Sequence, residues 1–236
     1  MKLAIHQPEF IPWMGFFYKM ASADAYVIFD HVQFKKRYFE NRNRIVSPRC
    51  KIDYLTVPVL NKDRFPQSIN QVEIDNSKEW KRKLIKSIFH YYSKAPFFRN
   101  YFDELEKLII ENEYAKLLSL NLVIIDFFRQ NLSIETPMIC SSGLNVGEFK
   151  ASDLILQICL NMNADEYLCG PSGRDYLNQD EFRNHNIQIT WLDYECPPYQ
   201  QLCDHFIPNL STLDLLFNAG PYSAQIIMNQ KKIREL

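Results

Sequence analysis

The first thirty residues contain the pattern that most constrains the fold of this chain. An apolar run at 3–5 is followed by a loop with two prolines, a segment at 13–23 with apolar residues at helical spacing, and a second apolar run at 25–29. Strand, loop, helix and strand in this order are typical of a βαβ unit, in which the two strands lie parallel. The pattern therefore predicts an α/β fold with a mostly parallel central sheet flanked by helices.

The rest of the chain extends this pattern. Apolar spacing predicts helices at about 78–93, 97–112 and 114–131, so a helical segment (about 78–132) is inserted between the N-terminal and C-terminal β-α units. We expect further strands at 53–59, 70–75, 166–169 and 187–192, and a loop at 61–68. Helices are expected at 150–163 and 179–185, and a helical region at 211–229 interrupted at Gly220-Pro221. Residues 31–47 mix cations, amides and aromatic residues and show no clean period.

Composition sets limits on the class of protein. With 236 residues, of which 47% are hydrophobic, the chain is expected to form a single domain over residues 1–236. The net charge of −1 argues against binding to nucleic acid. No apolar run is long enough for a transmembrane helix or a signal peptide, so we expect a cytoplasmic protein. The six cysteines form no C-x-x-C pair and are expected to be reduced, buried thiols.

The loop after the first strand is the first candidate site, since ligands of open α/β sheets bind at the carboxyl ends of the strands. His6 is a candidate general acid or base, and Gln7 suits a substrate hydroxyl or amide. Two prolines stiffen the loop, and Trp13 offers a ring for stacking. The same side chains equally fit a structural role, in which they complete the strand end and the core.

The loop after the second strand is the second candidate. Asp30 ends that strand and is taken, with His6, as a candidate catalytic residue. Cations in the loop suit a phosphate or carboxylate, and its amides suit sugar hydroxyls. A solvated basic face is the alternative, but the interleaved aromatic residues make it less favourable. The candidate substrate-binding residues of this loop are Gln33, Lys36, Arg37, Asn41, Arg42 and Asn43.

The third candidate is the tight loop that follows the strand at 166–169. Its candidate substrate-binding residues are Gly170, Ser172, Asp175 and Tyr176. The loop lacks the G-x-S-x-G spacing of a nucleophilic serine. Cys169 is positioned to act as a nucleophile, although a buried structural thiol is the more favoured interpretation.

Cofactor signatures are missing from the sequence. Neither G-x-x-x-x-G-K-[ST] nor G-x-G-x-x-G occurs, and the five histidines are too far apart to indicate a metal site. The cofactor therefore stays open between an acyl or aminoacyl donor and ATP. The expected partner is a small sugar or nucleotide substrate, and the oligomeric state is not determined by the sequence.

Three stretches together resemble the WbqC-like protein family. The first contains His6-Gln7-Pro8, Pro12-Trp13, Gly15 and Asp30-x-Val32-Gln33-Phe34, and the second is Asn41-Arg42-Asn43-Arg44-Ile45. The third contains Tyr167-Leu168-x-Gly170-Pro171-Ser172-Gly173-x-Asp175-Tyr176-Leu177, with Phe206-Ile207-Pro208-Asn209-Leu210-Ser211 and Asp214-Leu215-Leu216-Phe217-Asn218 further on. Cys169 and Arg174 stand where the family commonly has Ser and Lys.

The resemblance implies a role in the biosynthesis of cell-surface polysaccharide of the O-antigen (lipopolysaccharide) type. The reaction that it suggests is transfer of an acyl or aminoacyl group to an amino sugar carried on a nucleotide or a lipid. In such a transferase His6 would be the base, and Lys36, Arg37 and Arg42 would bind phosphate. The residues suited to reading hydroxyl groups are Gln7, Gln33, Asn41 and Asn43.

Two other functions fit parts of the sequence. A strand that ends in His before a Pro/Trp/Gly loop is similar to nucleotidyltransferase and pantothenate-synthetase domains, which implies an ATP-using nucleotidyltransferase or adenylate-forming ligase. Their His-x-Gly-His signature is incomplete here, because Trp13-Met14-Gly15-Phe16 stands in place of Gly-His. A non-catalytic scaffold of polysaccharide assembly would instead expose an apolar patch from the aromatic-rich region 89–102.

Overall fold

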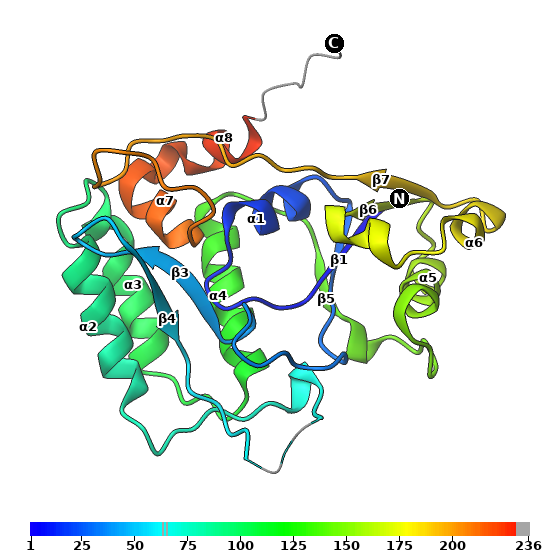
Figure 1. Ribbon diagram of the computed structural model, residues 1–236, viewed down its shortest axis with the longest axis horizontal. Helices are drawn as coiled ribbons and strands as arrows, with labels where there is room; N and C mark the ends of the chain where they lie inside the picture. Colours follow the sequence, from blue (N-terminus) through cyan, green and yellow to red (C-terminus); the bar gives the residue numbers. More distant parts are fainter. Residues whose placement is uncertain (63, 65, 230–236) are drawn as a thin grey trace.

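A parallel sheet forms the centre of the protein in the computed structural model, which describes residues 1–62, 64 and 66–229 (Figure 1). Within these residues the sheet has five strands in the order β5-β2-β1-β6-β7. β1 (Lys2–His6) lies in the middle and pairs with β2 (Ala25–Ile28) and β6 (Glu166–Cys169). β5 (Met138–Cys140) and β7 (Gln188–Trp191) are the edges. The predicted α/β fold with a mostly parallel sheet is confirmed.

Helices cover both faces of this sheet. Leu3 and Ile5 of β1 pack in a core with α5 (Ala151–Asn161) and α6 (Gln179–Asn184). Ala4, which points to the opposite face, packs in a second core with α1 (Met14–Ala21) and α4 (Leu117–Asn131). This alternation is the period of a strand that is buried on both faces, which explains the unbroken apolar run at 3–5.

The predicted helical segment consists of α2 (Trp80–Tyr92), α3 (Phe98–Ile110) and α4. Its aromatic side chains are mostly core: Tyr92, Phe98 and Phe102 are buried, and Phe98 packs against Phe217 of α7 (Thr212–Ala219). Among these rings Phe89 is partly exposed. The rings of region 89–102 therefore serve mainly to pack the helices together.

A β-hairpin lies beside the helical segment, where residues 31–47 showed no clean period. β3 (Arg42–Val46) and β4 (Ile52–Thr56) pair antiparallel and form a separate two-stranded sheet (Figure 1). The polar residues of β3 are accommodated by specific partners. Asn43 bonds to backbone carbonyls, and the Arg42 guanidinium lies 4.6 Å from the centre of the Tyr54 ring. These contacts replace the alternating apolar pattern by which a strand is normally recognised.

The strand predicted at 70–75 is wrong. Residues Ile69–Gln71 form a 3₁₀ helix, and 73 and 74 make only isolated bridges. The backbone N–H groups of Ile69 and Asn70 bond to the carbonyls of Val32 and Asp30, so the loop after β2 holds this segment. The preceding loop, expected at 61–68, includes 63 and 65, which lie outside the described residues.

The C-terminal part closes the fold against the helical half. α7 is followed by a 3₁₀ turn (Gly220–Tyr222) and α8 (Ser223–Met228), so the predicted interruption at Gly220-Pro221 is present. Gly220 has a φ of +55°, and a Cβ there would come within 2.4 Å of the Phe97 ring. Two further 3₁₀ turns, Ser141–Gly143 and Pro171–Asp175, follow β5 and β6. None of the helices in the described part of the chain is long and apolar enough to span a membrane.

The expectation of six reduced thiols is wrong for two of the cysteines. Cys50, in the β3–β4 turn, and Cys203, before α7, form a disulfide across 153 positions of sequence. Sequence spacing gives no sign of a pair so far apart, since only tertiary packing brings the two thiols together. Cys140, Cys159, Cys169 and Cys196 are free. That residues 1–236 form one domain remains a prediction.

Candidate functional site

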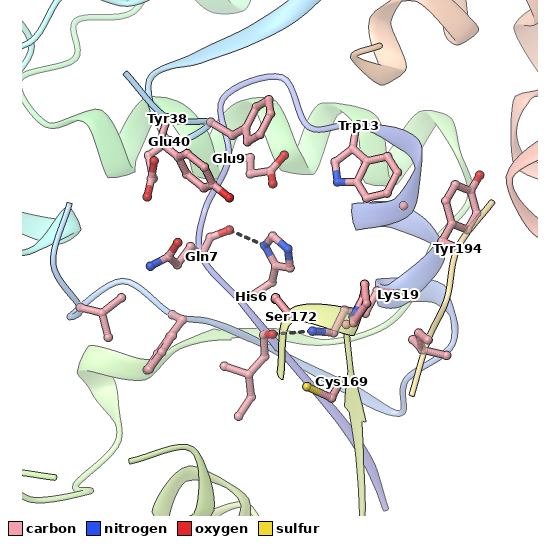
Figure 2. Close-up of a pocket in the computed structure, with 18 of the residues that line it drawn as sticks. His6, Gln7, Glu9, Trp13, Lys19, Tyr38, Glu40, Cys169, Ser172 and Tyr194 are labelled. Carbon is pink, nitrogen blue, oxygen red and sulfur yellow. Dashed lines mark hydrogen bonds between the residues drawn. The ribbon is translucent and has the colours of Figure 1, made fainter. Parts of the chain in front are cut away.

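A cavity of about 880 Å³ opens at the carboxyl ends of β1 and β6 (Figure 2). Its walls come from the end of β1 and the loop after it, from α1, and from residues 29–44, 151–155, 167–176 and 192–209. The carboxyl edge of a parallel sheet is the usual place for a ligand in such folds, because loops from neighbouring strands meet there. The volume is in the range of small-molecule sites.

His6 is the last residue of β1 and projects into this cavity. Its Nδ1 lies 2.9 Å from the Gln7 carbonyl oxygen, so Nδ1 carries the proton and donates, which leaves the Nε2 lone pair open. Burial, with a smaller effect of the Lys19 charge, lowers the pKa of His6 to about 4. The imidazole is therefore neutral at physiological pH and able to accept a proton.

Lys19 reaches the same cavity from α1. Its ammonium donates to the Ile5 carbonyl at 2.7 Å, where β1 ends, and lies 5.9 Å from the centre of the Tyr167 ring. Burial lowers the pKa of Lys19 to about 8, and the nearby thiols of Cys169 and Cys159 act in the opposite direction. Lys19 thus places a cationic group in the cavity wall and links α1 to the central strand.

Two buried carboxyl groups face the cavity. Glu9 and Glu40 are 6% and 1% exposed, and they come from the loop after β1 and the loop before β3. Burial first, and the charge of Glu40 second, raise the pKa of Glu9 to about 8. Burial raises the pKa of Glu40 to about 7. The site therefore holds a carboxyl pair that changes its charge near neutral pH.

The loop that carries Gln7 and Glu9 is held in a fixed shape. Ile11 has a φ of +47°, in the left-handed region that a β-branched residue rarely adopts. The Asn43 amide donates to the carbonyls of Phe10 at 3.2 Å and of Ile11 at 3.0 Å, so β3 secures the loop in this shape. Asn43 therefore lines the cavity and also supports the loop after β1.

Aromatic and cationic side chains complete the walls. The Trp13 ring lies edge-on to Tyr194, with 5.5 Å between centroids. Trp13 can pack in this way because Gly15 has no side chain: a Cβ there would lie 2.3 Å from the indole. Arg44 lies over the Phe39 ring at 5.4 Å, and its buried Nε has no partner among the described residues. Such walls suit a ligand with apolar faces and anionic or hydroxyl groups.

The candidates of the sequence fall into two groups in space. The candidates that line the cavity are His6, Gln7, Trp13, Asn43, Gly170, Ser172, Asp175 and Tyr176. The others lie outside it: Asp30, Gln33, Lys36, Arg37, Asn41 and Arg42.

Asp30 has a structural position. It is fully buried, and its carboxylate accepts bonds from Ser141 Oγ at 2.9 Å and from the backbone N–H and Oγ of Ser142 at 2.8 and 2.6 Å. These bonds join the end of β2 to the turn after β5, which satisfies the carboxylate and keeps it out of the cavity.

The other candidates of the loop after β2, apart from Asn43, also lie outside the cavity lining, although substrate-binding residues were expected to be part of it. Gln33, Lys36 and Arg37 are exposed at the surface, and Arg42 stacks on Tyr54 in the hairpin. Asn41 is buried and donates to the Val57 carbonyl at 2.9 Å. The cations that do line the cavity are Lys35, Arg44 and Lys19.

The loop after β6 forms the rim opposite the carboxyl pair. Ser172, Asp175 and Tyr176 are exposed there, and Arg174 is bound to Asp193 by two bonds of 2.9 and 2.8 Å. Burial raises the pKa of the Cys169 thiol, which disfavours the thiolate that a nucleophile requires. The structural interpretation of Cys169 is therefore the better supported.

Glu9, Glu40, Lys19 and Tyr194 were missed as site residues. Glu9 lies between two candidates, and its position in the loop after β1 was the one signal that pointed to it. Glu40 likewise lies between candidates of the loop after β2, whereas Tyr194 stands in a segment without such a signal. Among the described residues no group of three His, Cys, Asp or Glu side chains is arranged to hold a metal ion.

Comparison with known proteins gives one family and one relative. The model of the WbqC-like protein family matches residues 7–226. The uncharacterized protein Rv1507c of Mycobacterium tuberculosis is 34% identical over 220 residues, which cover 93% of this chain and 94% of that protein. No solved structure matches the chain.

Proposed function

The chain belongs to the WbqC-like protein family, and on that premise we propose that it is a transferase of cell-surface polysaccharide biosynthesis. Its substrate would be an activated amino sugar of an O-antigen-type pathway, and its reaction the transfer of an acyl or aminoacyl group to the sugar nitrogen. The reaction would take place in the cytoplasm on a sugar linked to a nucleotide or a lipid.

The observation that carries this proposal is the neutral His6 in a cavity of about 880 Å³. Transfer of an acyl group to an amine needs a base that is unprotonated at working pH. It also needs a site large enough for a sugar and part of its carrier, with rings that contact the sugar faces. Trp13, Tyr38 and Tyr176 are available for that contact.

The step itself can be written with these residues. The sugar nitrogen attacks the acyl carbonyl carbon, a C–N bond forms, and the bond from that carbon to the donor's leaving group breaks. His6 Nε2 accepts the proton that the nitrogen loses on attack and returns it to the leaving group. Gln7 supplies an amide group to sugar hydroxyls, Asn43 holds the loop that carries Gln7, and Arg44 and Lys35 supply positive charge to a phosphate.

The first prediction concerns the substitution His6→Ala. We expect this variant to fold normally, because His6 is partly buried and its side chain bonds to the carbonyl of its neighbour Gln7. We expect the acylation rate to fall by about 10²- to 10⁴-fold, the usual contribution of a general base. The measurement is mass spectrometry of UDP- and dTDP-linked amino sugars incubated with acyl-CoA or aminoacyl donors.

Two outcomes decide against the proposal. One is that no amino sugar is modified by the wild-type protein with any donor. The other is that His6→Ala retains full activity, which would remove His6 from the chemistry. The adenylate-forming alternative is tested by measuring the melting temperature with ATP and Mg²⁺. A ligand at about 100 times its Kd stabilises the fold by about 2.7 kcal/mol, so the melting temperature should rise if ATP binds.

A further inference from the structure

The Glu9–Glu40 pair is the least satisfied part of the cavity wall. Oε2 of Glu9 and both carboxyl oxygens of Glu40 have no partner at hydrogen-bond geometry among the described residues, although backbone N–H groups of Glu40 and Lys35 lie near enough to lower the pKa of Glu40. Both side chains are more than nine-tenths buried and line the cavity, and Figure 2 shows them on the same side of it, with the Tyr38 ring drawn between them. Buried polar groups without partners cost free energy, so a native structure retains them where a ligand supplies the missing bonds.

The chemistry of that ligand follows from the groups that face the pair. An ionised carboxylate only accepts hydrogen bonds, so its partner has to be a donor. Two carboxyl groups in a buried space also repel each other when charged, as the effect of Glu40 on the pKa of Glu9 indicates. A ligand with both hydrogen-bond donors and a positive charge supplies the missing bonds and also offsets the repulsion between the carboxylates. A hydroxyl group supplies only the bonds.

The protein's own cations leave this role open. Within the described residues neither Glu9 nor Glu40 forms an ion pair, and Arg44 is the weakest of the influences on Glu9. Lys35 lies over the Tyr38 ring at 5.1 Å and has a minor effect on Glu40. One further titratable group interacts with Glu9, the buried phenol of Tyr26.

We propose that the Glu9–Glu40 pair is the subsite that binds the amino group of the substrate, as an ammonium ion held by both carboxyl groups. The inference rests on the proposed sugar transferase and adds to it the requirement for a primary amine at this wall. It places the nitrogen in the cavity that contains His6, with the sugar ring between the pair and the aromatic walls.

The same pair suits the proton that an ammonium has to lose before it attacks. One carboxylate of the pair takes that proton, which leaves a neutral amine with its lone pair and a carboxylic acid. A base works best when its pKa lies near the working pH, and the pKa of Glu40, about 7, meets this condition. His6, with a pKa of about 4, is too weak a base for the ammonium and takes the second proton after attack.

The test compares ligands that differ only in the amino group. Nucleotide-linked amino sugars, with the amine at each ring carbon in turn, are titrated by calorimetry beside the same sugars with a hydroxyl in its place, in UDP and dTDP forms. For at least one pair we expect the amino ligand to bind about tenfold more tightly, equivalent to about 1.4 kcal/mol. Glu9→Gln and Glu40→Gln keep the shape of the side chain and are expected to abolish this preference.

A matched control and a pH series complete the experiment. Glu166→Gln changes a carboxyl that accepts from Thr190 Oγ1 on the sheet, outside the cavity lining, and should retain the preference. In the wild-type protein, affinity for the amino ligand should rise from pH 6 to pH 8 as the pair ionises, while affinity for the hydroxyl ligand stays flat. This series tests the inference even where a Gln variant fails to fold.

Each outcome has one reading. Equal binding of amino and hydroxyl ligands overturns this inference alone and leaves the transferase proposal standing. A preference that survives in both Gln variants, or an affinity that does not change with pH, also overturns it. Binding of no nucleotide sugar overturns the proposed function and this inference together.

Discussion

Buried carboxyl groups make the stability of this protein depend on pH. In the fold the pKa of Glu9 is about 8, against an ordinary value of 4.5. The neutral form is favoured by folding, so its contribution is complete below about pH 4.5 and is lost as the pH rises toward 8. Glu40, with a pKa of about 7, adds to the same trend.

We therefore predict that the melting temperature of the wild-type protein falls between pH 5 and pH 8, and that Glu9→Gln reduces this fall. Each unit of difference in pKa corresponds to about 1.4 kcal/mol, so the effect should be several degrees. Thermal unfolding followed by circular dichroism across the pH range is the measurement. Parallel curves for the two proteins would contradict the burial described for Glu9.

At the scale of single residues, candidate site residues were identified in the sequence by their position after a strand. That position does not tell which way the side chain points. His6 and Asp30 both end buried parallel strands. His6 projects into the cavity, whereas Asp30 is turned toward the Ser141–Ser142 turn, which satisfies its carboxylate. Glu9 and Glu40 were beyond prediction because a glutamate in a loop is normally exposed, and only contacts with distant segments bury this pair.

Among the elements, α4 determines how the two acidic loops lie relative to each other. The buried amide of Asn121 donates to the Pro8 carbonyl at 3.3 Å and to the Glu40 carbonyl at 2.8 Å. One side chain thus joins the residue before Glu9 to Glu40 itself. The spacing of the carboxyl pair depends on these two bonds.

Asn121→Leu removes both donors and leaves two buried carbonyl groups unpaired. We expect a loss of about 1–3 kcal/mol in the free energy of unfolding, the usual cost of an unsatisfied buried group. We also expect weaker binding of amino ligands. Urea denaturation measures the first effect, with Asn131→Ala on the same helix as a control that removes a bond to Phe127 within the helix. An equal effect of the two substitutions would remove the special role of Asn121.

The elements themselves were predictable to different degrees, for physical reasons. The parallel strands and α2 to α4 follow from apolar patterns that match their burial. β3 was not found, because Asn43 is satisfied by the loop after β1 and Arg42 by a ring across the hairpin, and neither partner is local in sequence. No strand forms at 70–75, because Asn70 bonds to the loop after β2 within a 3₁₀ helix at Ile69–Gln71, and the N–H groups of Ile74 and Asp75 bond to the separate carbonyls of Ala115 and Pro58.

For the molecule as a whole, the Cys50–Cys203 disulfide joins the hairpin to the segment that leads into α7. The same segment, which contains Cys203, completes the cavity wall with Leu192, Tyr194 and Asn209. The bond therefore helps to fix one wall of the site as well as the fold. It closes a loop of 153 positions, for which chain entropy gives a large stabilisation.

We predict that reduction lowers the free energy of unfolding by about 2–5 kcal/mol, the usual range for a native disulfide. The double substitution Cys50→Ser and Cys203→Ser should match the reduced wild-type protein and be insensitive to reductant. The measurement is denaturant unfolding with and without dithiothreitol, after titration of free thiols. If reductant leaves the wild-type curve unchanged, the disulfide does not contribute to stability.

The central position of β1 in the sheet affects how the protein folds during its synthesis. β1 leaves the ribosome long before one of its two neighbours, β6, which begins only at Glu166. During most of synthesis β1 is paired on one side at most, and its other edge is open to incorrect partners. Completion of the sheet is thus delayed until β6 has been synthesised, and chaperone dependence and slow refolding are the expected signs.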